Sequence, residues 1–161
     1  MAGHLLHAGC QVTVYNRTAS KAQAWVEKFG GKAAATPREA AEDADVVFTC
    51  VGNDSDLRSV LLGENGAFAG MKKDAVLWDA TTDSAEVAKE MAAEAQSRGL
   101  HFVDAPVSGG QDGAVSGSLT VMCGGDAEII ERVKPIADAF ACSIRRIGPV
   151  GSGDRKSTRL N

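Results

Sequence analysis

The residues best suited to chemistry in this sequence form the run from Asp104 to Gly110, which follows an apolar stretch that begins at Leu100. The run ends in Ser108, Gly109 and Gly110, which offer one hydroxyl group and two amides that no side chain covers. Such donors suit the carboxylate of a small organic acid. The alternative is an ordinary turn, because Ser-Gly-Gly is common in turns. The three residues are therefore candidate substrate-binding residues.

A second polar group, Asn16, Arg17 and Thr18, follows an alternating run at Gln11–Tyr15 that predicts a strand. An acidic residue at this point of a dinucleotide-binding sheet would bind the ribose hydroxyls and repel a 2′-phosphate. The chain has no acid there, whereas Asn16 and Thr18 can donate hydrogen bonds and Arg17 can pair with a phosphate. The group therefore favours NADP, with NAD as a possible cofactor. The alternative is a turn with a solvated arginine.

These candidates need a scaffold, and the hydrophobic pattern predicts strands and helices in alternation. We expect strands over 11–15, 45–51, 75–79, 100–107, 118–123 and 143–147. We expect helices over 1–8, 20–29, 37–44, 54–62, 84–98 and 126–141, and a glycine-rich loop over 108–117. This alternation predicts an α/β, Rossmann-like, doubly wound and mostly parallel sheet. Ligands of such sheets bind at the carboxyl ends of the strands.

Composition excludes several classes of function. The net charge of −4 gives no electrostatic basis for binding nucleic acid or an anionic membrane. No run of about 18 apolar residues is present to span a bilayer. The cysteines fit no zinc or redox spacing and the histidines form no cluster with acids or thiols, so we expect no metal site. We interpret the cysteines as buried thiols of a cytoplasmic protein.

Several ordered motifs together resemble the β-hydroxyacid dehydrogenases, the family of 3-hydroxyisobutyrate dehydrogenase and tartronate semialdehyde reductase. They are Asp104–Gly110, Leu119–Gly125 and Asp79–Thr82, the last similar to the family's Asp-x-Ser-Thr. The resemblance spans nearly all of residues 1–153. It implies that the Ser-Gly-Gly trio binds the carboxylate of a small acid. It also implies hydride transfer between a nicotinamide and the β-carbon of a hydroxyacid or semialdehyde.

The same resemblance implies cofactor contacts after two further strands. The family has Leu-Pro at the pair matching Val51 and Gly52, where backbone touches the dinucleotide, and Gly52 permits a close approach. A family asparagine aligns with Asp56, which changes that contact, and Thr82 is placed beside the nicotinamide. The alternative for all four is structural, because polar residues in such loops cap the helices that follow.

Both ends of the chain depart from the family pattern. The family's Gly-x-Gly-x-x-Gly turn lies upstream of the segment similar to Met1–Ala8, so we expect a domain over 1–153 that lacks its first strand and glycine-rich turn. The family's catalytic lysine falls at Ser157, so no catalytic residue is expected. Residues 154–161 read like a translated sequencing adapter, which predicts a non-native tail. The resemblance further implies that the parent is a homo-oligomer formed through a helical domain absent here.

The sequence therefore predicts an NAD(P)-dependent oxidoreductase of the 3-hydroxyisobutyrate dehydrogenase type, present as an inactive fragment. Two other functions stay open. A related imine reductase or 6-phosphogluconate dehydrogenase would share the architecture, although an imine has no carboxylate for the Ser-Gly-Gly trio. A non-catalytic nucleotide-binding or interaction module would also explain the absence of the lysine.

Overall fold

The computed structural model describes residues 1–153 as strands and helices in alternation. The strands are β1 (Thr13–Val14), β2 (Lys32–Ala33), β3 (Val46–Thr49), β4 (Val76–Asp79), β5 (His101–Asp104), β6 (Val107–Ser108), β7 (Leu119–Gly124) and β8 (Ala141–Gly148). The helices are α1 (Ala2–His7), α2 (Ala19–Phe29), α3 (Pro37–Ala41), α4 (Asp54–Leu61), α5 (Ala67–Gly70), α6 (Ala85–Ser97), α7 (Gly110–Ser116) and α8 (Ala127–Ala137). The α/β alternation predicted from the sequence is confirmed.

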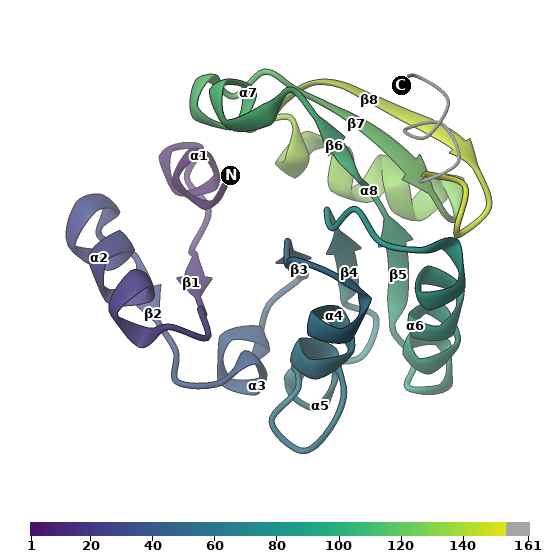
Figure 1. Ribbon diagram of the computed structural model, residues 1–161, viewed down its shortest axis with the longest axis horizontal. Helices are drawn as coiled ribbons and strands as arrows, with labels where there is room; N and C mark the ends of the chain where they lie inside the picture. Colours follow the sequence, from purple (N-terminus) through teal and green to yellow (C-terminus); the bar gives the residue numbers. More distant parts are fainter. Residues whose placement is uncertain (154–161) are drawn as a thin grey trace.

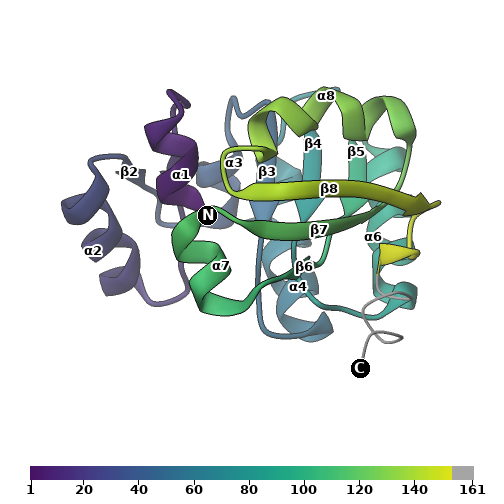
Figure 2. The same ribbon diagram turned by 90° about the horizontal axis from the view of Figure 1, so that it is seen from above.

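The described strands form two sheets. β1 and β2 pair in parallel, and the larger sheet has the order β3-β4-β5-β7-β6, with β8 paired to β7. β3, β4 and β5 run parallel, whereas β7 runs antiparallel to β5 and β6 and parallel to β8. Figure 1 shows β6, β7 and β8 crossing beyond the carboxyl ends of β4 and β5, and Figure 2 shows α8 along one side of β7 and β8. The sheet is thus mostly parallel, with an antiparallel junction at β7.

Two apolar clusters cover the two faces of the larger sheet. Along β4, Val76 and Trp78 enter one cluster and Leu77 enters the other, and all three are fully buried. Val133 of α8 joins the first cluster and Met91 of α6 joins the second. A strand buried on both faces needs this continuous apolar sequence, which is the pattern that predicted it.

The single strand predicted over 100–107 is wrong, because the structure has two strands there. β5 ends at Asp104, and β6 begins at Val107 and pairs antiparallel with β7. Pro106 lies between them and has no N–H to donate to a ladder. Its carbonyl instead accepts the N–H of Met122 at 3.2 Å. The chain therefore changes direction just before the Ser-Gly-Gly trio.

The glycine-rich loop predicted over 108–117 is also wrong for most of its length, because α7 occupies it. Glycine permits this helix to pack closely on β7: a Cβ built on Gly113 would lie 3.1 Å from Cδ2 of Leu119. The helix ends at Ser116, and Gly117, which follows it, has a left-handed φ of 71°. Packing thus overrides the low helix propensity of glycine.

Side chains that precede two of the helices cap their first turns. Oγ1 of Thr36 accepts the N–H of Glu39 ahead of α3, and Asp126 accepts two N–H groups at the start of α8. The prediction that the last helix reaches residue 141 is wrong. α8 ends at Ala137, two residues after Pro135, which has no N–H for the helical pattern.

The interpretation of all four cysteines as buried is wrong. Cys123 is buried, Cys10 is half-buried, and Cys50 and Cys142 are exposed, all as free thiols. Cys142 lies on β8, whose outer edge pairs with no other described strand. Of the helices within residues 1–153, none has the length and apolar character needed to cross a membrane. The same residues bring together no group of three or more metal-ligating side chains.

Candidate functional site

The loops after β3 and β4 are joined by hydrogen bonds at the carboxyl edge of the sheet. Oγ1 of Thr49 donates to Oδ1 of Asp79 at 2.8 Å, and the N–H of Val51 donates to Oγ1 of Thr81 at 3.1 Å. Thr81 is buried, whereas Thr82 is exposed. The structure therefore brings two of the predicted cofactor loops side by side. Thr81 makes the contact between the loops, whereas the side chain of Thr82 is exposed to solvent.

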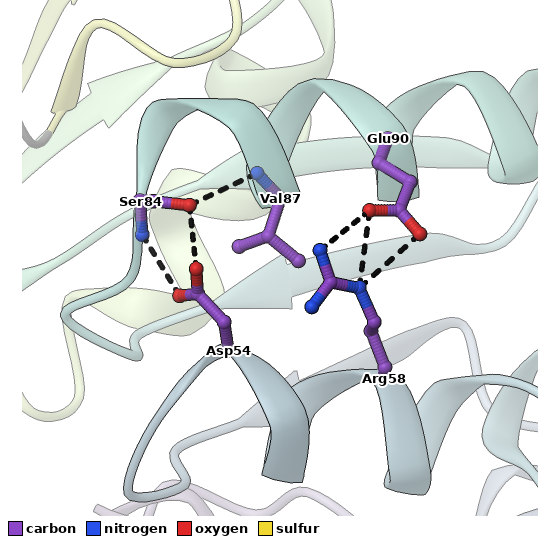
Figure 3. A network of polar contacts seen from close by, with 5 residues as sticks. All are labelled: Asp54, Arg58, Ser84, Val87 and Glu90. Atoms are coloured by element: carbon purple, nitrogen blue, oxygen red, sulfur yellow. Dashed lines mark hydrogen bonds and ion pairs between the residues drawn. The ribbon is translucent and has the colours of Figure 1, made fainter.

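A polar network joins the helices that follow these loops (Figure 3). Asp54 of α4 accepts the N–H of Ser84 at 3.0 Å and its hydroxyl at 2.6 Å, while Oγ of Ser84 accepts the N–H of Val87. These hydrogen bonds lower the pKa of Asp54. One turn further along, Arg58 makes a bidentate ion pair with Glu90, with a shortest N–O distance of 2.8 Å. The network fixes the starts of α4 and α6 relative to each other.

The predicted group after β1 faces the start of α4. Oδ1 of Asn16 accepts the N–H of Thr18 at 2.9 Å, which forms the turn before α2. The Arg17 side chain is 84% exposed, and its Nη1 lies 3.5 Å from Oδ1 of Asp56. A Cβ built on Gly52 would lie 3.1 Å from Oδ2 of Asp56. The carboxylate therefore lies between two of the predicted cofactor-binding positions.

The predicted substrate trio lies where β6 passes into α7. Ser108, Gly109 and Gly110 are all exposed, and the two glycines have φ values of 133° and 62°. Side chains are strained at such φ values, so glycine is required by the backbone conformation. Among the described residues, no side-chain hydrogen bond joins this trio to Val51, Gly52 or Thr82. Figure 1 places β6 on the side of the sheet to which β4 and β5 point.

Three buried carboxyls at the ends of β4 and β5 were not predicted from the sequence. Burial raises the pKa values of Asp79 and Asp104. Burial, followed by hydrogen bonding to and repulsion from Asp79, raises the pKa of Asp83 to about 8. Asp79 and Asp83 each have one buried oxygen without a hydrogen-bond partner among the described residues. A proton shared between the two carboxyl groups would give both oxygens a partner. In the sequence, the pattern that could have indicated these carboxyls is Asp-x-x-x-Asp, formed by Asp79 and Asp83 at the end of an apolar run.

Replacing Asp83 with asparagine should remove a pH dependence of stability. The folded chain retains the Asp83 proton up to about pH 8, whereas an unfolded chain releases it near pH 4. The folded state binds more protons between these values, so the free energy of unfolding should fall as pH rises, by at most about 1.4 kcal/mol per pH unit. The amide has no proton to release and still donates to Asp79. Urea unfolding from pH 5 to 9 measures how the free energy of unfolding depends on pH in the parent chain and in Asp83→Asn.

The exposed Asp112 gives the matched control, because Asp112→Asn should leave the slope of the parent chain unchanged. The same downward slope in Asp83→Asn and in the parent chain would contradict the assignment of the proton to Asp83.

Residues 1–148 match the family described as the NAD binding domain of 6-phosphogluconate dehydrogenase. The chain belongs to this family. The NAD-binding domain is 56% identical to an uncharacterized oxidoreductase of Shewanella frigidimarina, over 95% of this chain and 53% of that protein. It is 45% identical to the Arabidopsis thaliana protein named "Probable 3-hydroxyisobutyrate dehydrogenase-like 2, mitochondrial", over 95% of this chain and 50% of that protein.

A solved structure agrees with these relatives. The 3-hydroxyisobutyrate dehydrogenase of Mycobacterium tuberculosis with L-serine superimposes with a TM-score of 0.92 at 28% identity, covering 99% of this chain and 53% of that one. The NAD-binding domain spans about half the length of the curated relatives it matches. The resemblance to 3-hydroxyisobutyrate dehydrogenase-like oxidoreductases is confirmed, and so is the Rossmann-like fold.

Proposed function

We propose that the NAD-binding domain serves an NADP-dependent dehydrogenase that acts on a small β-hydroxyacid or the corresponding semialdehyde. The observation that carries the substrate class is the exposed turn at Ser108, Gly109 and Gly110, on the side of the sheet where strands β4 and β5 end. One hydroxyl and adjacent backbone amides can donate to a carboxylate and so hold the reacting carbon in place. A substrate without a carboxylate would leave these donors unpaired.

The residues at the carboxyl edge fit a dinucleotide. Arg17 is exposed and has no acidic neighbour within its own turn, which suits a ribose 2′-phosphate. Gly52 has no side chain, so a ligand can approach the backbone after Val51 closely. Exposed Thr82 can donate a hydrogen bond near the nicotinamide. When bound, the cofactor supplies the hydride, and these residues bind and orient it.

The same proposal includes a longer parent enzyme. The family likeness supports a first strand and a glycine-rich turn ahead of the segment Met1–Ala8, and a helical domain that supplies the lysine and forms the oligomer. Ser157 and the suspected non-native tail 154–161 lie outside the described residues. We therefore propose that 1–153 is the native part of the 161-residue chain, that this chain alone does not catalyse the reaction, and that the parent acts in the cytoplasm. Measurable turnover of 3-hydroxyisobutyrate by the purified 161-residue chain would overturn the proposed inactivity.

The test of the substrate class uses the complete protein encoded by the same gene. It should oxidise 3-hydroxyisobutyrate with NADP, and it should lose most of its kcat/KM for the uncharged 3-hydroxyisobutyramide. The amide keeps the reacting carbon and removes the negative charge, so the pair isolates carboxylate recognition. Equal kcat/KM values for acid and amide would overturn the proposed role of the Ser-Gly-Gly trio.

Replacing Ser108 with alanine in that protein should raise KM for the hydroxyacid by about 10-fold, because a hydrogen bond to a charged group contributes roughly 1.5 kcal/mol or more. The affinity for NADP should stay unchanged, since Ser108 is assigned to the substrate. Ser97→Ala is the control, because Ser97 is exposed at the far end of α6 and bonds only locally, to the carbonyl of Glu94. Steady-state kinetics measures KM for the hydroxyacid and for NADP in both variants. A weaker affinity for NADP in Ser108→Ala would contradict the assignment of Ser108 to the substrate.

A further inference from the structure

The carboxyl group of Asp79 connects the loops that follow β3 and β4. Its Oδ1 atom accepts the hydroxyl of Thr49 at 2.8 Å and the N–H of Thr81 at 3.1 Å. The hydroxyl oxygen of Thr81 in turn accepts the N–H of Val51 at 3.1 Å. One carboxyl oxygen therefore holds the end of β3 and the loop after β4, and through Thr81 it also holds the backbone at Val51.

These contacts lie directly beside the positions assigned to the cofactor. Val51 and Gly52 are proposed to bring backbone close to the dinucleotide, and Thr82, which follows Thr81, is proposed to lie near the nicotinamide. Asp79 itself is fully buried. It is therefore a candidate positioning residue, which acts on a bound cofactor through the backbone that it holds.

The second oxygen of Asp79 faces a different situation. Oδ2 of Asp79 and Oδ2 of Asp83 are both buried, and neither has a hydrogen-bond partner among the described residues. Asp83 is 7% exposed and directly precedes Ser84, which caps α6. Two buried carboxylates without partners repel each other, whereas one proton between them replaces the repulsion with a hydrogen bond.

The other titratable groups around this pair do not favour two negative charges. Asp104 adds a like charge from the end of β5. Cys50 faces Asp79 from the end of β3. From α4, the carboxylate of Asp54 bonds to the residue that directly follows Asp83 (Figure 3).

Cations do not compensate for these acidic groups. Within residues 1–153, no salt bridge joins a lysine, arginine or histidine to Asp79 or Asp83. The amino group of Met1 acts on Cys50. A proton is therefore the partner that the two buried oxygens require.

We propose that Asp79 and Asp83 hold the two cofactor loops in their binding position through one shared proton, and that loss of this proton weakens the binding of NADP and NAD. The inference rests on the proposed function, because it assigns a pH dependence to the cofactor site proposed there. The proton leaves to solvent, and the two carboxylates then repel each other. Asp79 can move only with Thr49 and Thr81, so the backbone at Val51 is displaced as well.

The pKa of Asp83, raised to about 8 by burial and by Asp79, sets the pH range in which binding should change. Roughly nine-tenths of the molecules hold the proton at pH 7 and roughly one-tenth at pH 9. The apparent Kd rises in inverse proportion to the fraction that is competent to bind, which gives a rise of about 10-fold over this range.

Fluorescence titration with NADPH and NADH at pH 7 and pH 9 tests the proposal on the complete protein encoded by the same gene. The parent should bind both dinucleotides about 10-fold more weakly at pH 9. NADH has no 2′-phosphate, so a change shared by both dinucleotides does not arise at Arg17. In Asp83→Asn the change should be less than about 2-fold, because the amide donates to Asp79 at every pH.

Two control variants test whether the change belongs to this pair. Glu86→Gln removes an acidic group that is exposed on the first turn of α6, and the 10-fold change should persist. Cys50→Ala removes the thiol that faces Asp79, and the change should persist there too. A flat profile in Cys50→Ala would overturn the proposal in favour of the thiol.

A second measurement needs neither cofactor nor catalysis. In the 161-residue chain, the Cγ resonances of Asp79 and Asp83, followed by carbon NMR, should shift together with one midpoint near pH 8, because the two groups share the proton. In Asp83→Asn, the Cγ resonance of Asp79 should show no step near this pH. Absence of a common step in the parent chain would overturn the shared proton.

The two measurements separate this inference from the function on which it rests. A common step near pH 8, together with equal affinities at pH 7 and pH 9, would overturn the positioning role and leave the proposed function intact. Equal losses of affinity in the parent and in Asp83→Asn would do the same. Failure of the complete protein to bind either dinucleotide at pH 7 would overturn the proposed function, and this inference with it.

Discussion

Replacing Asp104 with alanine is expected to lower the free energy of unfolding by about 3 kcal/mol. Asp104 is 2% exposed, and its carboxylate accepts the N–H groups of Gly151 and Gly153 at 2.8 and 2.9 Å. Both glycines are buried, so the alanine variant would leave two buried donors without acceptors, each at a cost of roughly 1–3 kcal/mol. Urea denaturation followed by circular dichroism measures the loss.

Two further variants make this measurement specific. Asp104→Asn keeps one acceptor oxygen and should lose about half as much stability, roughly 1.5 kcal/mol. Asp138→Ala removes an exposed carboxylate at the end of α8 and should change stability by less than about 0.5 kcal/mol. Equal losses in Asp104→Ala and Asp138→Ala would show that the bonds to the Gly151–Gly153 segment do not stabilise the fold.

Replacing Arg17 with alanine should reduce the affinity for NADP by about 10- to 100-fold, because a charge-assisted bond to the 2′-phosphate contributes roughly 1.5–3 kcal/mol. The affinity for NAD should change by less than about 3-fold, since NAD has no phosphate at that position. Fluorescence titration of the complete protein with NADPH and NADH measures the two affinities. Arg145→Ala is the charge-matched control, because Arg145 is exposed on β8.

The neighbouring carboxylate gives the complementary result. Asp56 lies 3.5 Å from Arg17 and would compete with a 2′-phosphate for it, so Asp56→Asn should raise the preference for NADP over NAD by up to about 10-fold. A pair this exposed is weak in itself, so the fold should keep its stability. If Arg17→Ala weakens NADPH and NADH equally, the predicted cofactor preference is wrong.

Local signals in the sequence predicted much of the fold. Apolar runs predicted β3 and β4, because this signal acts over a few neighbouring residues. The direction of pairing at β7 was not predictable in this way. An apolar strand has the same sequence pattern whether its neighbour is parallel or antiparallel. The change of direction at Pro106 could therefore not be predicted from the sequence.

Residue type alone was enough to propose candidate positions for ligand binding, whereas the features that follow from tertiary packing were missed. Exposed Arg17 and Ser108 suit their proposed ligands through their own chemistry. The raised pKa of Asp83 depends on burial beside Asp79, and burial is set by the whole sheet. The helix α7 was missed for a similar reason, since the approach of Gly113 to Leu119 outweighs local propensity.

The contact of Asp54 with Ser84 should restrict which residues evolve at these two positions. It joins the loops after β3 and β4, because loss of either partner would leave a half-buried polar group of the other without its hydrogen bond. Changes at positions 54 and 84 should therefore be inherited together among relatives, and lineages that alter one residue should show a compensating change at the other.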